Sequence, residues 1–134
     1  MKAEQIIPVI RIFDYQKAVE FYMNWLGFEM VWEHRFENHS PAYMEIIKDG
    51  MVFHLSEHHD DATPGSSTFI WGQGIAEYHR ELIDKNYPYN RPGLEKTFYA
   101  AVAFTVVDPF GNRIIFNEKF DEEKHKDLNF NSIH

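Results

Sequence analysis

Hydrophobic and polar positions along the chain change their period in a regular order. Residues 6–13 are a β-branched apolar run that is typical of a strand. Residues 15–26 follow with apolar positions three and four apart, as on one face of a helix. Asp14 stands where a side chain can cap the start of this helix, and Gly27 stands where a left-handed residue can end it. Residues 28–36 then alternate between apolar and polar, which predicts a second strand.

Two more strands complete this first set of elements. Residues 42–48 and 51–57 are predicted strands, and they are separated by Asp49-Gly50. An Asp-Gly pair favours the two-residue turn of a hairpin, because both of its residues tolerate a positive φ. The polar residues 59–66 that follow are predicted to be a linker.

The same order of elements then returns along the rest of the chain. The predicted elements are a strand at 67–72, a helix at 74–85, a short and broken strand at 89–94, and paired strands at 99–107 and 112–118. The turn between the last two strands has proline and glycine at the positions that a β-turn favours.

This return is an internal repeat. Residues 49–57 resemble residues 110–118, since each stretch starts with a turn glycine, continues as an apolar strand and ends with glutamate. Residues 7–26 align with residues 67–86 at nearly the same offset, with a strand before a helix in both. A repeat of this kind determines the architecture before any propensity argument is needed.

We therefore predict an α+β fold in which two βαβββ modules follow each other in one domain, residues 1–134. The predicted parts are module 1 at about 5–58, the linker at 59–66, module 2 at about 67–118 and a surface tail at 119–134. A helix can cover one face of each four-stranded set, and the other face needs a different partner. We expect the strands to form a curved, half-barrel-like mixed sheet with a cleft, where a ligand would bind.

Composition excludes several classes of function. The chain has no cysteine, which rules out disulfides, thiolate catalysis and cysteine metal ligands and is compatible with a cytoplasmic location. Its formal net charge of −8 makes nucleic acid an unfavourable partner and a cationic molecule a better one. No apolar run approaches the roughly 18 residues of a membrane helix, so we expect no membrane association. Aromatic residues make up 16% of the chain, which suits a ligand that stacks on rings.

Four segments carry a resemblance to a known family. They are residues 7–10 (IPVI), 14–22 (DYQKAVEFY), 26–28 (LGF) and 108–113 (DPFGNR). Together with the repeat, they resemble the vicinal-oxygen-chelate superfamily, which includes glyoxalase I, extradiol dioxygenases, fosfomycin-resistance enzymes and bleomycin-resistance proteins. The resemblance covers residues 5–118 and implies two tandem βαβββ modules, but one fold hosts many functions.

The resemblance also implies where a metal would bind. Metal-dependent members carry a ligand on the first and last strand of each module, and these positions fall on Ile7, Ser67, His54 and Ile115. A divalent cation needs nitrogen or oxygen donors, which isoleucine lacks and serine supplies poorly. We therefore expect no metal, no other cofactor and no catalytic residue. A metal-dependent lyase or transferase of the glyoxalase or dioxygenase type remains the alternative.

Among members without this metal site, the chain most resembles the bleomycin-resistance proteins, whose first strand opens with a pair like Pro8-Val9. That group implies a protein that sequesters a cationic or aromatic antibiotic-like molecule without changing its bonds. It also implies a homodimer, with the N-terminal strand as a candidate for exchange between protomers. One position departs from the group, because Tyr99-Ala100 stands where the group often has a Trp-Gly pair.

Strand alternation predicts which side chains face the cleft. Phe69, Trp71 and Tyr99 could stack on a planar ligand, although packing in a core or a dimer contact is the other interpretation. His54 could donate a hydrogen bond to a ligand or be a structural group, and Glu45 could attract a cation or be simply solvated. The predicted ligand-binding residues are Phe69, Trp71, Tyr99, His54, Ser67, Arg113, Ile115 and Glu45.

Two further groups of residues are expected to have no role in the site. Trp32 and Phe36 share a strand face with Met30, so we expect them to pack. Residues 58–61 (HHDD) have the composition of a metal cluster, but adjacent residues in a loop cannot converge on one ion. We therefore expect this segment to be a solvated loop.

Overall fold

A computed structural model describes residues 1–130 and 132–133 of the chain. The predicted tail at 119–134 therefore includes two residues, 131 and 134, that lie outside the described residues. The chain forms two compact units, one made of Met1–Ser66 with Asp108–Asn112 and the other of Ser67–Val107 with Arg113–His134. In the part of the chain that was described, no helix is long and apolar enough to cross a membrane.

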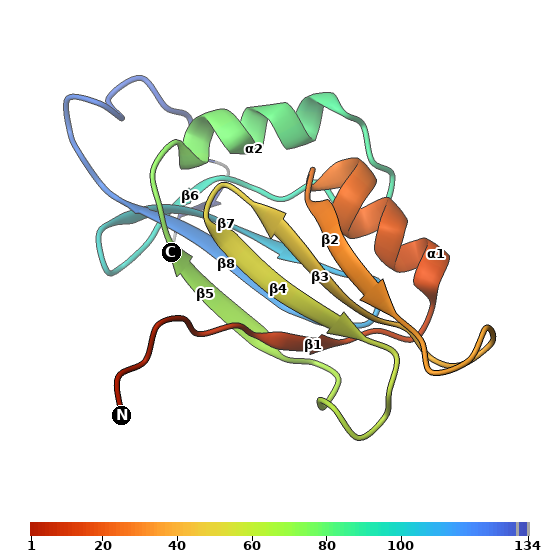
Figure 1. Ribbon diagram of the computed structural model, residues 1–134. Helices are drawn as coiled ribbons and strands as arrows, with labels where there is room; N and C mark the ends of the chain where they lie inside the picture. The colour runs from red at the N-terminus through yellow and green to blue at the C-terminus, as the bar shows by residue number, and fades with distance from the viewer. Residues whose placement is uncertain (131, 134) are drawn as a thin grey trace. The chain divides into compact units, whose positions relative to one another are not determined.

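The first unit contains a four-stranded mixed sheet in the order β1-β4-β3-β2 (Figure 1). Its strands are β1 (Val9–Arg11), β2 (Glu29–His34), β3 (Tyr43–Lys48) and β4 (Met51–Ser56). β1 runs parallel to β4, and the other neighbours are antiparallel. Asp49 and Gly50 join β3 to β4 with φ values of 48° and 87°, which is the two-residue turn that their pair predicted.

The second unit repeats this arrangement with a sheet in the order β5-β8-β7-β6-β9. Its elements are β5 (Ser67–Trp71), α2 (Ile75–Asp84), β6 (Glu95–Lys96), β7 (Ala101–Val107), β8 (Arg113–Lys119) and β9 (Ser132–Ile133). β5 runs parallel to β8, β7 runs antiparallel to both β8 and β6, and β6 runs parallel to β9. The α+β class and the two βαβββ modules are therefore confirmed. Their strands form two separate sheets, one in each unit, and the shared cleft stays a prediction.

Strand register confirms the internal repeat residue by residue. Val9 pairs with His54 in the first unit, and Phe69 pairs with Ile115 in the second. These pairs are the ones that the sequence alignment of the two copies requires. His54 and Ile115 are thus equivalent positions, as the repeat predicted.

The helical segment of the first unit differs from its prediction. Asp14 caps it as expected, with Oδ1 accepting a hydrogen bond from the Lys17 amide at 3.0 Å. The α-helix α1 spans only Tyr15–Ala18, and the π-helical segment η1 spans Val19–Trp25. At its end the Leu26 amide donates to the carbonyl of Phe21 at 2.9 Å, five residues back. Apolar positions three and four apart fit both kinds of helix, so the sequence pattern could not separate them.

One face of each sheet is buried against its unit's helical segment. In the first unit Phe21, Tyr22 and Trp25 of η1 are buried, and the Tyr22 ring contacts Phe28, which stacks on Phe53. In the second unit α2 packs on β7 and β8, where Phe104 and Phe116 and their neighbours are buried. The other buried strand residues include Ile10, Met44, Ile46, Leu55, Val102, Val106 and Ile114. Alternation leaves the opposite face of each sheet with the side chains that are partly or fully exposed.

Three of the predicted elements need correction. The first strand covers Val9–Arg11 rather than residues 6–13, because its register with β4 extends over these three residues and its backbone hydrogen bonds to β4 end at Pro8 and Ile12. Residues 89–94 are not a strand, and the short strand β6 lies just after them. The segment after Phe120 is not only surface, since the His125 side chain is buried. The first two features depend on pairing with other strands, which local patterning does not report. His125 is buried against nearby residues of its own segment, including Phe120 and Asp121.

The turn at residues 108–112 has a structural role within the first unit. The buried Tyr22 hydroxyl donates to Asp108 Oδ2 at 2.7 Å. Asn112 Nδ2 donates to Asp108 Oδ2 and to the Arg11 carbonyl, both at 2.8 Å. Asn112 Oδ1 accepts hydrogen bonds from the amides of Gly65 and Ser66 and from the Ser66 hydroxyl. Part of the sequence motif that carries the family resemblance is therefore explained by folding rather than by chemistry.

Candidate functional site

Three aromatic side chains form a cluster on the open face of the second sheet. The ring centroids of Phe69 and Trp71 are 5.5 Å apart, and Tyr99 lies 5.7 Å from Phe69 and 6.0 Å from Trp71. Phe69 and Trp71 are 49% and 51% exposed. We call these three residues the aromatic cluster. The structure thus brings together the three residues for which the sequence predicted stacking.

Local structure explains how the aromatic cluster is held. Phe69 and Trp71 are two residues apart on β5, so they point to the same face. Tyr99 lies in the turn before β7, where the following Ala100 has a φ of 59°. The Tyr99 hydroxyl donates to Asn117 Oδ1 at 2.5 Å, and Asn117 Nδ2 donates to the carbonyls of Ile70 and Ile115. Tyr99 is therefore tied to β8 through a buried amide.

Asn117 is a residue of this site that the predicted list omitted. It is completely buried, although it lies on the face that carries the aromatic cluster, and it pairs with Trp71 in the parallel register. The sequence did contain a signal for it, which is an asparagine inside an apolar strand. A buried amide requires hydrogen-bond partners, so such a residue indicates a side-chain contact.

The three other predicted residues of the second unit lie along the same face. Ile115 pairs with Phe69 in the register and is half-buried beside the aromatic cluster. Ser67 and Arg113 pair with each other one row further along, and both are exposed. Ile115 therefore lies next to the aromatic cluster. Ser67 and Arg113 lie on the same face at the start of β5 and β8, one residue pair away from it.

The remaining two predicted residues lie in the first unit and contact each other. His54 Nε2 is 2.9 Å from Glu45 Oε1, and His54 Nδ1 is 2.7 Å from the Tyr43 hydroxyl. The Trp32 ring stacks on Tyr43 at 5.8 Å and 9°, and its edge contact with His54 is 5.3 Å. Trp32 therefore packs on its neighbours, as expected, and it is also 40% exposed. Tyr43 was absent from the predicted site.

The hydrogen bonds of His54 connect three titratable groups in a row. A neutral imidazole has one donor and one acceptor nitrogen, so a proton on Nε2 directed at Glu45 leaves Nδ1 to accept from Tyr43. Partial burial, and then the nearby charges of Asp61 and Glu45, raise the pKa of the Tyr43 phenol. The phenol is thus kept in its protonated, hydrogen-bond-donating form.

Among the described residues, no set of side chains offers the donors of a metal site. Residues 1–130 contain no group of three histidine, aspartate or glutamate side chains that could hold an ion together. Both ring nitrogens of His54 already have partners within the first unit. The equivalent residue of the second module, Ile115, has only carbon and hydrogen in its side chain. The residues therefore do not fit the ion of the metal-dependent enzymes.

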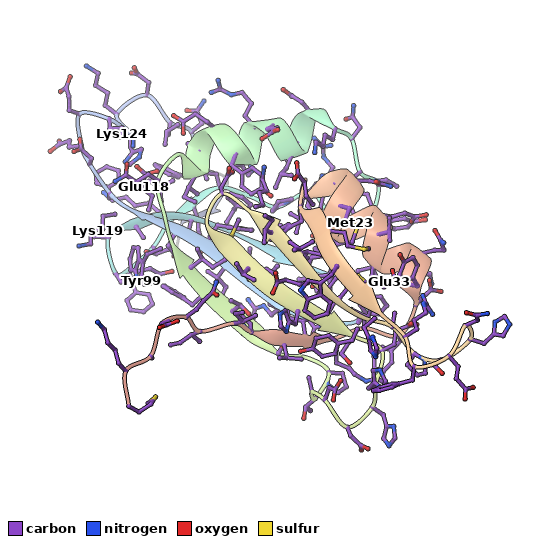
Figure 2. The ribbon with its side chains drawn as sticks, in the orientation of Figure 1. Met23, Glu33, Tyr99, Glu118, Lys119 and Lys124 are labelled. Atoms are coloured by element: carbon purple, nitrogen blue, oxygen red, sulfur yellow. The ribbon has the colours of Figure 1, made fainter. Side chains whose placement is uncertain are left out.

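A hollow of about 500 Å³ lies beside Trp71 at the carboxyl end of β5. It is lined by Trp71, Gln73, Glu118, Lys119, Asp121 and Lys124, among others. Figure 2 labels three residues of its lining, Glu118, Lys119 and Lys124, together with Tyr99 of the cluster. Glu118 Oε1 accepts from the Ile75 amide at 3.1 Å, and Glu118 Oε2 accepts from Lys124 Nζ at 2.5 Å. Burial opposes ionisation of Glu118, but the bonds from Lys124 and Ile75 and the charges of Lys124 and His125 outweigh it and lower the pKa. Glu118 is therefore an ionised cap on the first turn of α2.

The known proteins that are similar to this chain include one curated relative and two solved structures. The bleomycin resistance protein of Geobacillus stearothermophilus is 25% identical over an alignment of 130 residues, with 84% of this chain and 94% of the relative covered. A bleomycin-binding protein in complex with bleomycin has a TM-score of 0.66 at 19% identity, with 87% and 99% of the two chains covered. TnmS3, an antibiotic-binding protein from Streptomyces sp. CB03234, has a TM-score of 0.66 at 18% identity, with 89% and 98% covered. At these identities, the two structures share the fold with this chain.

The family match and the fold agree. A protein-family model with the description "Glyoxalase superfamily protein" matches residues 1–123. These residues contain β1 to β8 and therefore both βαβββ modules. The parallel pairing of β1 with β4 returns as that of β5 with β8, as the duplicated architecture of the resemblance implied. The protein belongs to the glyoxalase superfamily.

Proposed function

We propose that the protein binds a small, planar aromatic molecule of the antibiotic kind through the aromatic cluster and does not change its bonds. The observation that carries the proposal is that Phe69, Trp71 and Tyr99 contact one another and two of them are about half exposed. Exposed aromatic rings that gather on one strand face are a surface for a planar partner.

The expected strength of this binding follows from the area that a ligand would cover. Complete burial of a large apolar side chain contributes about 1.5–3 kcal/mol, and Phe69 and Trp71 are already half covered. Aromatic stacking adds about 0.5–1.5 kcal/mol for each pair. A ligand that covers both rings would therefore gain about 1–3 kcal/mol from each of them, before any polar contact.

The named relatives suggest which ligand to test. The Geobacillus relative is called a bleomycin resistance protein, and one structure of the same fold is a bleomycin-binding protein in complex with bleomycin. A cationic ligand also suits a chain with a formal net charge of −8. Metal-free bleomycin is therefore the first ligand to titrate.

Calorimetric titration with bleomycin of the wild-type chain and of two variants, Trp71→Ala and Tyr99→Ala, tests the proposal. We expect each substitution to weaken binding about tenfold or more, since about 1.4 kcal/mol corresponds to a factor of ten. Tyr89→Ala is the matched control, because Tyr89 is 77% exposed and its ring packs on Tyr87 outside the cluster. Its affinity should equal that of the wild type.

Two results would contradict the proposal. Unchanged affinity in both cluster variants would show that the ligand binds elsewhere. Absence of binding to bleomycin at tens of micromolar would exclude that ligand, and the dye anilinonaphthalene sulfonate would then probe the cluster. A dye that gives the same fluorescence with wild type and Trp71→Ala would exclude the cluster as a binding surface.

We also propose that the protein is a homodimer in which the N-terminal segment is exchanged. The support is that Ile6 lies ahead of β1 and is 88% exposed, so the segment offers an apolar side chain to a partner. Sedimentation should give twice the chain mass of 15.9 kDa. Deletion of residues 1–6 should lower that mass to one chain, and a wild-type chain that sediments as a monomer would refute the proposal.

A further inference from the structure

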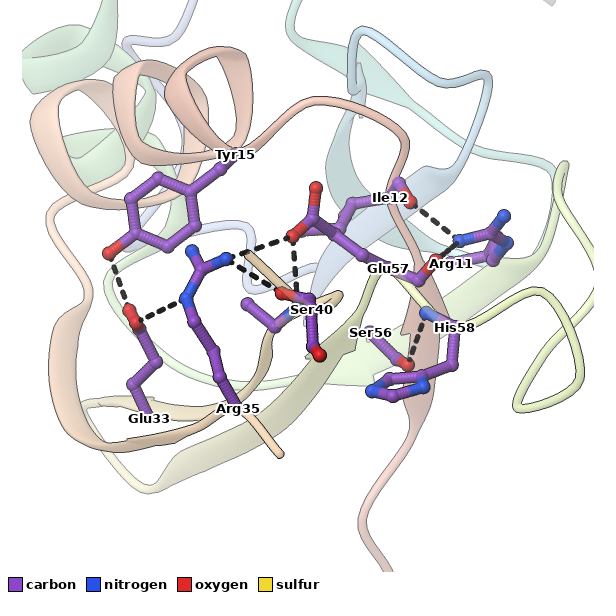
Figure 3. A network of polar contacts seen from close by, with 10 residues as sticks. Arg11, Ile12, Tyr15, Glu33, Arg35, Ser40, Ser56, Glu57 and His58 are labelled. Carbon is purple, nitrogen blue, oxygen red and sulfur yellow. Dashed lines mark hydrogen bonds and ion pairs between the residues drawn. The ribbon is translucent and has the colours of Figure 1, made fainter. Parts of the chain in front are cut away.

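A separate hollow lies at the carboxyl ends of β1 and β4 in the first unit. Its volume is about 270 Å³. Its lining includes two arginines, a histidine and one carboxylate beside two apolar side chains: Arg11, Arg35, His39, Glu57, Phe13 and Pro41. Figure 3 shows the polar contacts that surround it.

Arg11 is held in place while part of its guanidinium stays free. Its Nη1 donates to the carbonyls of Ile12 and Glu57, and its guanidinium lies 4.6 Å from the centre of the Phe13 ring. A guanidinium has five N–H groups, of which Nη1 carries two. Within residues 1–130, Nε and Nη2 of Arg11 have no hydrogen-bond partner, so this edge of the group is available to a ligand.

Arg35 is held in the same manner on another side of the hollow. Its Nε donates to Glu33 at 3.0 Å, its Nη1 donates to the carbonyl of Ser40 at 2.9 Å, and its guanidinium is 5.1 Å from the Tyr15 ring (Figure 3). Its Nη2 has no hydrogen-bond partner among the described residues. The same is true of the His39 ring. Free donors from three side chains therefore line one small hollow.

The lining of this hollow holds more cationic than anionic side chains, in a chain whose formal net charge is −8. It carries two arginines and the one carboxylate of Glu57, and a second carboxylate, Glu33, pairs with Arg35 from outside the lining. Glu57 Oε1 accepts from the Ala42 amide at 2.9 Å and lies 4.0 Å from Arg35 Nη1. Fixed guanidinium edges match carboxylate and phosphate oxygens, which accept two parallel hydrogen bonds.

The internal repeat supplies a comparison within the same molecule. The hollow beside β5 occupies the equivalent place of the second module, where Trp71, Gln73 and Glu118 replace Arg11, Phe13 and Glu57. A hollow at this place is thus a property of the module. The pair of anchored guanidinium groups is found only in the first of these two hollows.

We propose that the hollow formed by Arg11, Arg35 and His39 binds a small oxyanion, a carboxylate or a phosphate, on a molecule whose apolar part lies against Phe13 and Pro41. This site is in the first unit and is distinct from the aromatic cluster of the second unit. It adds a binding activity to the one proposed above and does not depend on it.

Nuclear magnetic resonance titrations at constant ionic strength test this site. The ligands are benzoate, acetate and inorganic phosphate, with benzylamine as the cationic counterpart of benzoate. We expect the three anions to shift the Nε–Hε signals of Arg11 and Arg35, and benzoate to bind more tightly than acetate because its ring contacts the apolar wall. If phosphate is the only one of the three anions that binds, the result supports the oxyanion site. It overturns the proposed contact of the ligand with Phe13 and Pro41.

Substitutions identify the residues responsible. Arg35→Gln should weaken benzoate binding about tenfold or more, as expected for a charged hydrogen-bonding partner. His39→Ala changes an exposed side chain and leaves the guanidinium groups of Arg11 and Arg35 in place, so it should weaken benzoate binding less. This variant replaces Arg35→Gln in the test if Arg35→Gln does not fold. Arg91→Gln removes an exposed arginine of the second unit and should have no effect.

Three results would overturn the proposal. The first is that no anion shifts the arginine signals, and the second is that benzylamine shifts them as benzoate does. The third is that Arg35→Gln and His39→Ala both bind benzoate like the wild type. Acetate has no ring to stack on the aromatic cluster, so the shifts that it causes in the arginine signals report on this site alone. Loss of those shifts would be failure of this site, whereas unchanged bleomycin affinity in Trp71→Ala would be failure of the aromatic cluster.

Discussion

At the scale of single residues, Glu118 shows how one side chain can serve two elements. Gly74 precedes α2 and has no side chain to cap it, so Glu118 reaches from the end of β8 to the Ile75 amide. Lys124 then brings the chain that follows β8 back to the same carboxylate. An ionised group with 5% exposure therefore links a strand, a helix and the segment after the strand.

Replacement of Glu118 by Gln should make stability depend less on pH. The native pKa of Glu118 lies below its ordinary value of 4.5, so the folded state favours the ionised form. Its contribution is complete above about pH 4.5 and is lost as the pH falls through the lowered native pKa. Urea unfolding at pH 7 should show a loss of about 1–3 kcal/mol in Glu118→Gln.

The difference between Glu118→Gln and the wild type should shrink in urea titrations at progressively lower pH below 4.5. Glu122→Gln is the matched control, because Glu122 is an exposed carboxylate in the same segment. A difference that is constant from neutral to acidic pH would mean that the charge of Glu118 has no part in its effect.

The residues of the candidate site were predicted to different degrees. Strand alternation was enough to place Phe69 and Trp71 on one face, because both lie in a single regular strand. Tyr99 came from the family resemblance, since its position depends on a turn. Strand alternation also placed Asn117 on the cleft face, but Asn117 was not among the predicted ligand-binding residues, and Tyr43 was missed. Their roles arise from side-chain hydrogen bonds, which residue spacing does not encode.

At the scale of elements, the turn at residues 108–112 supplies hydrogen bonds that the first unit cannot make from its own continuous segment. Asn112 connects this turn to Arg11, Gly65 and Ser66, and Asp108 accepts from the buried Tyr22 hydroxyl. A buried polar group that loses its partner costs more than the average net hydrogen bond contributes. The turn is therefore a structural part of the first unit as well as a connection between β7 and β8.

Asn112→Ala should lower the free energy of unfolding by about 2–4 kcal/mol, because several buried donors and acceptors lose their partners at once. Asn129→Ala, at an exposed position, is the control and should change stability by less than about 0.5 kcal/mol. Thermal and urea unfolding measure both variants. An Asn112→Ala chain as stable as the control would show that the turn contributes little.

Elements with local signals were predicted well, and elements set by distant partners were not. The β3–β4 hairpin was predicted because Asp49-Gly50 specifies its own turn. The two-residue strand β6 was missed because it exists only through its pairing with β7 and β9. The π-helical segment η1 was missed because its apolar spacing is also that of an α-helix.

At the scale of the whole molecule, the two modules share a backbone plan and differ in surface chemistry. The first module carries the hydrogen-bonded row of Tyr43, His54 and Glu45, and the second carries the aromatic cluster. His54 and Ile115 occupy the same place in the two copies, so the pair of donors that a metal site would need is not formed.

Purified protein should therefore bind no divalent metal in stoichiometric amount. Elemental analysis after incubation with nickel, zinc or manganese and removal of the excess should find well under one ion per chain, because one engaged imidazole is a weak site for any of these ions. One ion per chain that is lost in His54→Ala would refute this expectation and favour a metal-dependent enzyme.

The hydrogen bonds of Asn112 have a consequence for a fragment that contains only the first module. A fragment that stops at Ser66 contains every strand of the first sheet but lacks Asp108–Asn112, so its Tyr22 hydroxyl and its Gly65 and Ser66 amides would have no protein partner. The product of an ancestral single-module gene would have needed another source for these bonds. Of the two copies that resemble each other, the first is therefore complete only together with Asp108–Asn112, a turn that belongs to the second copy in the sequence.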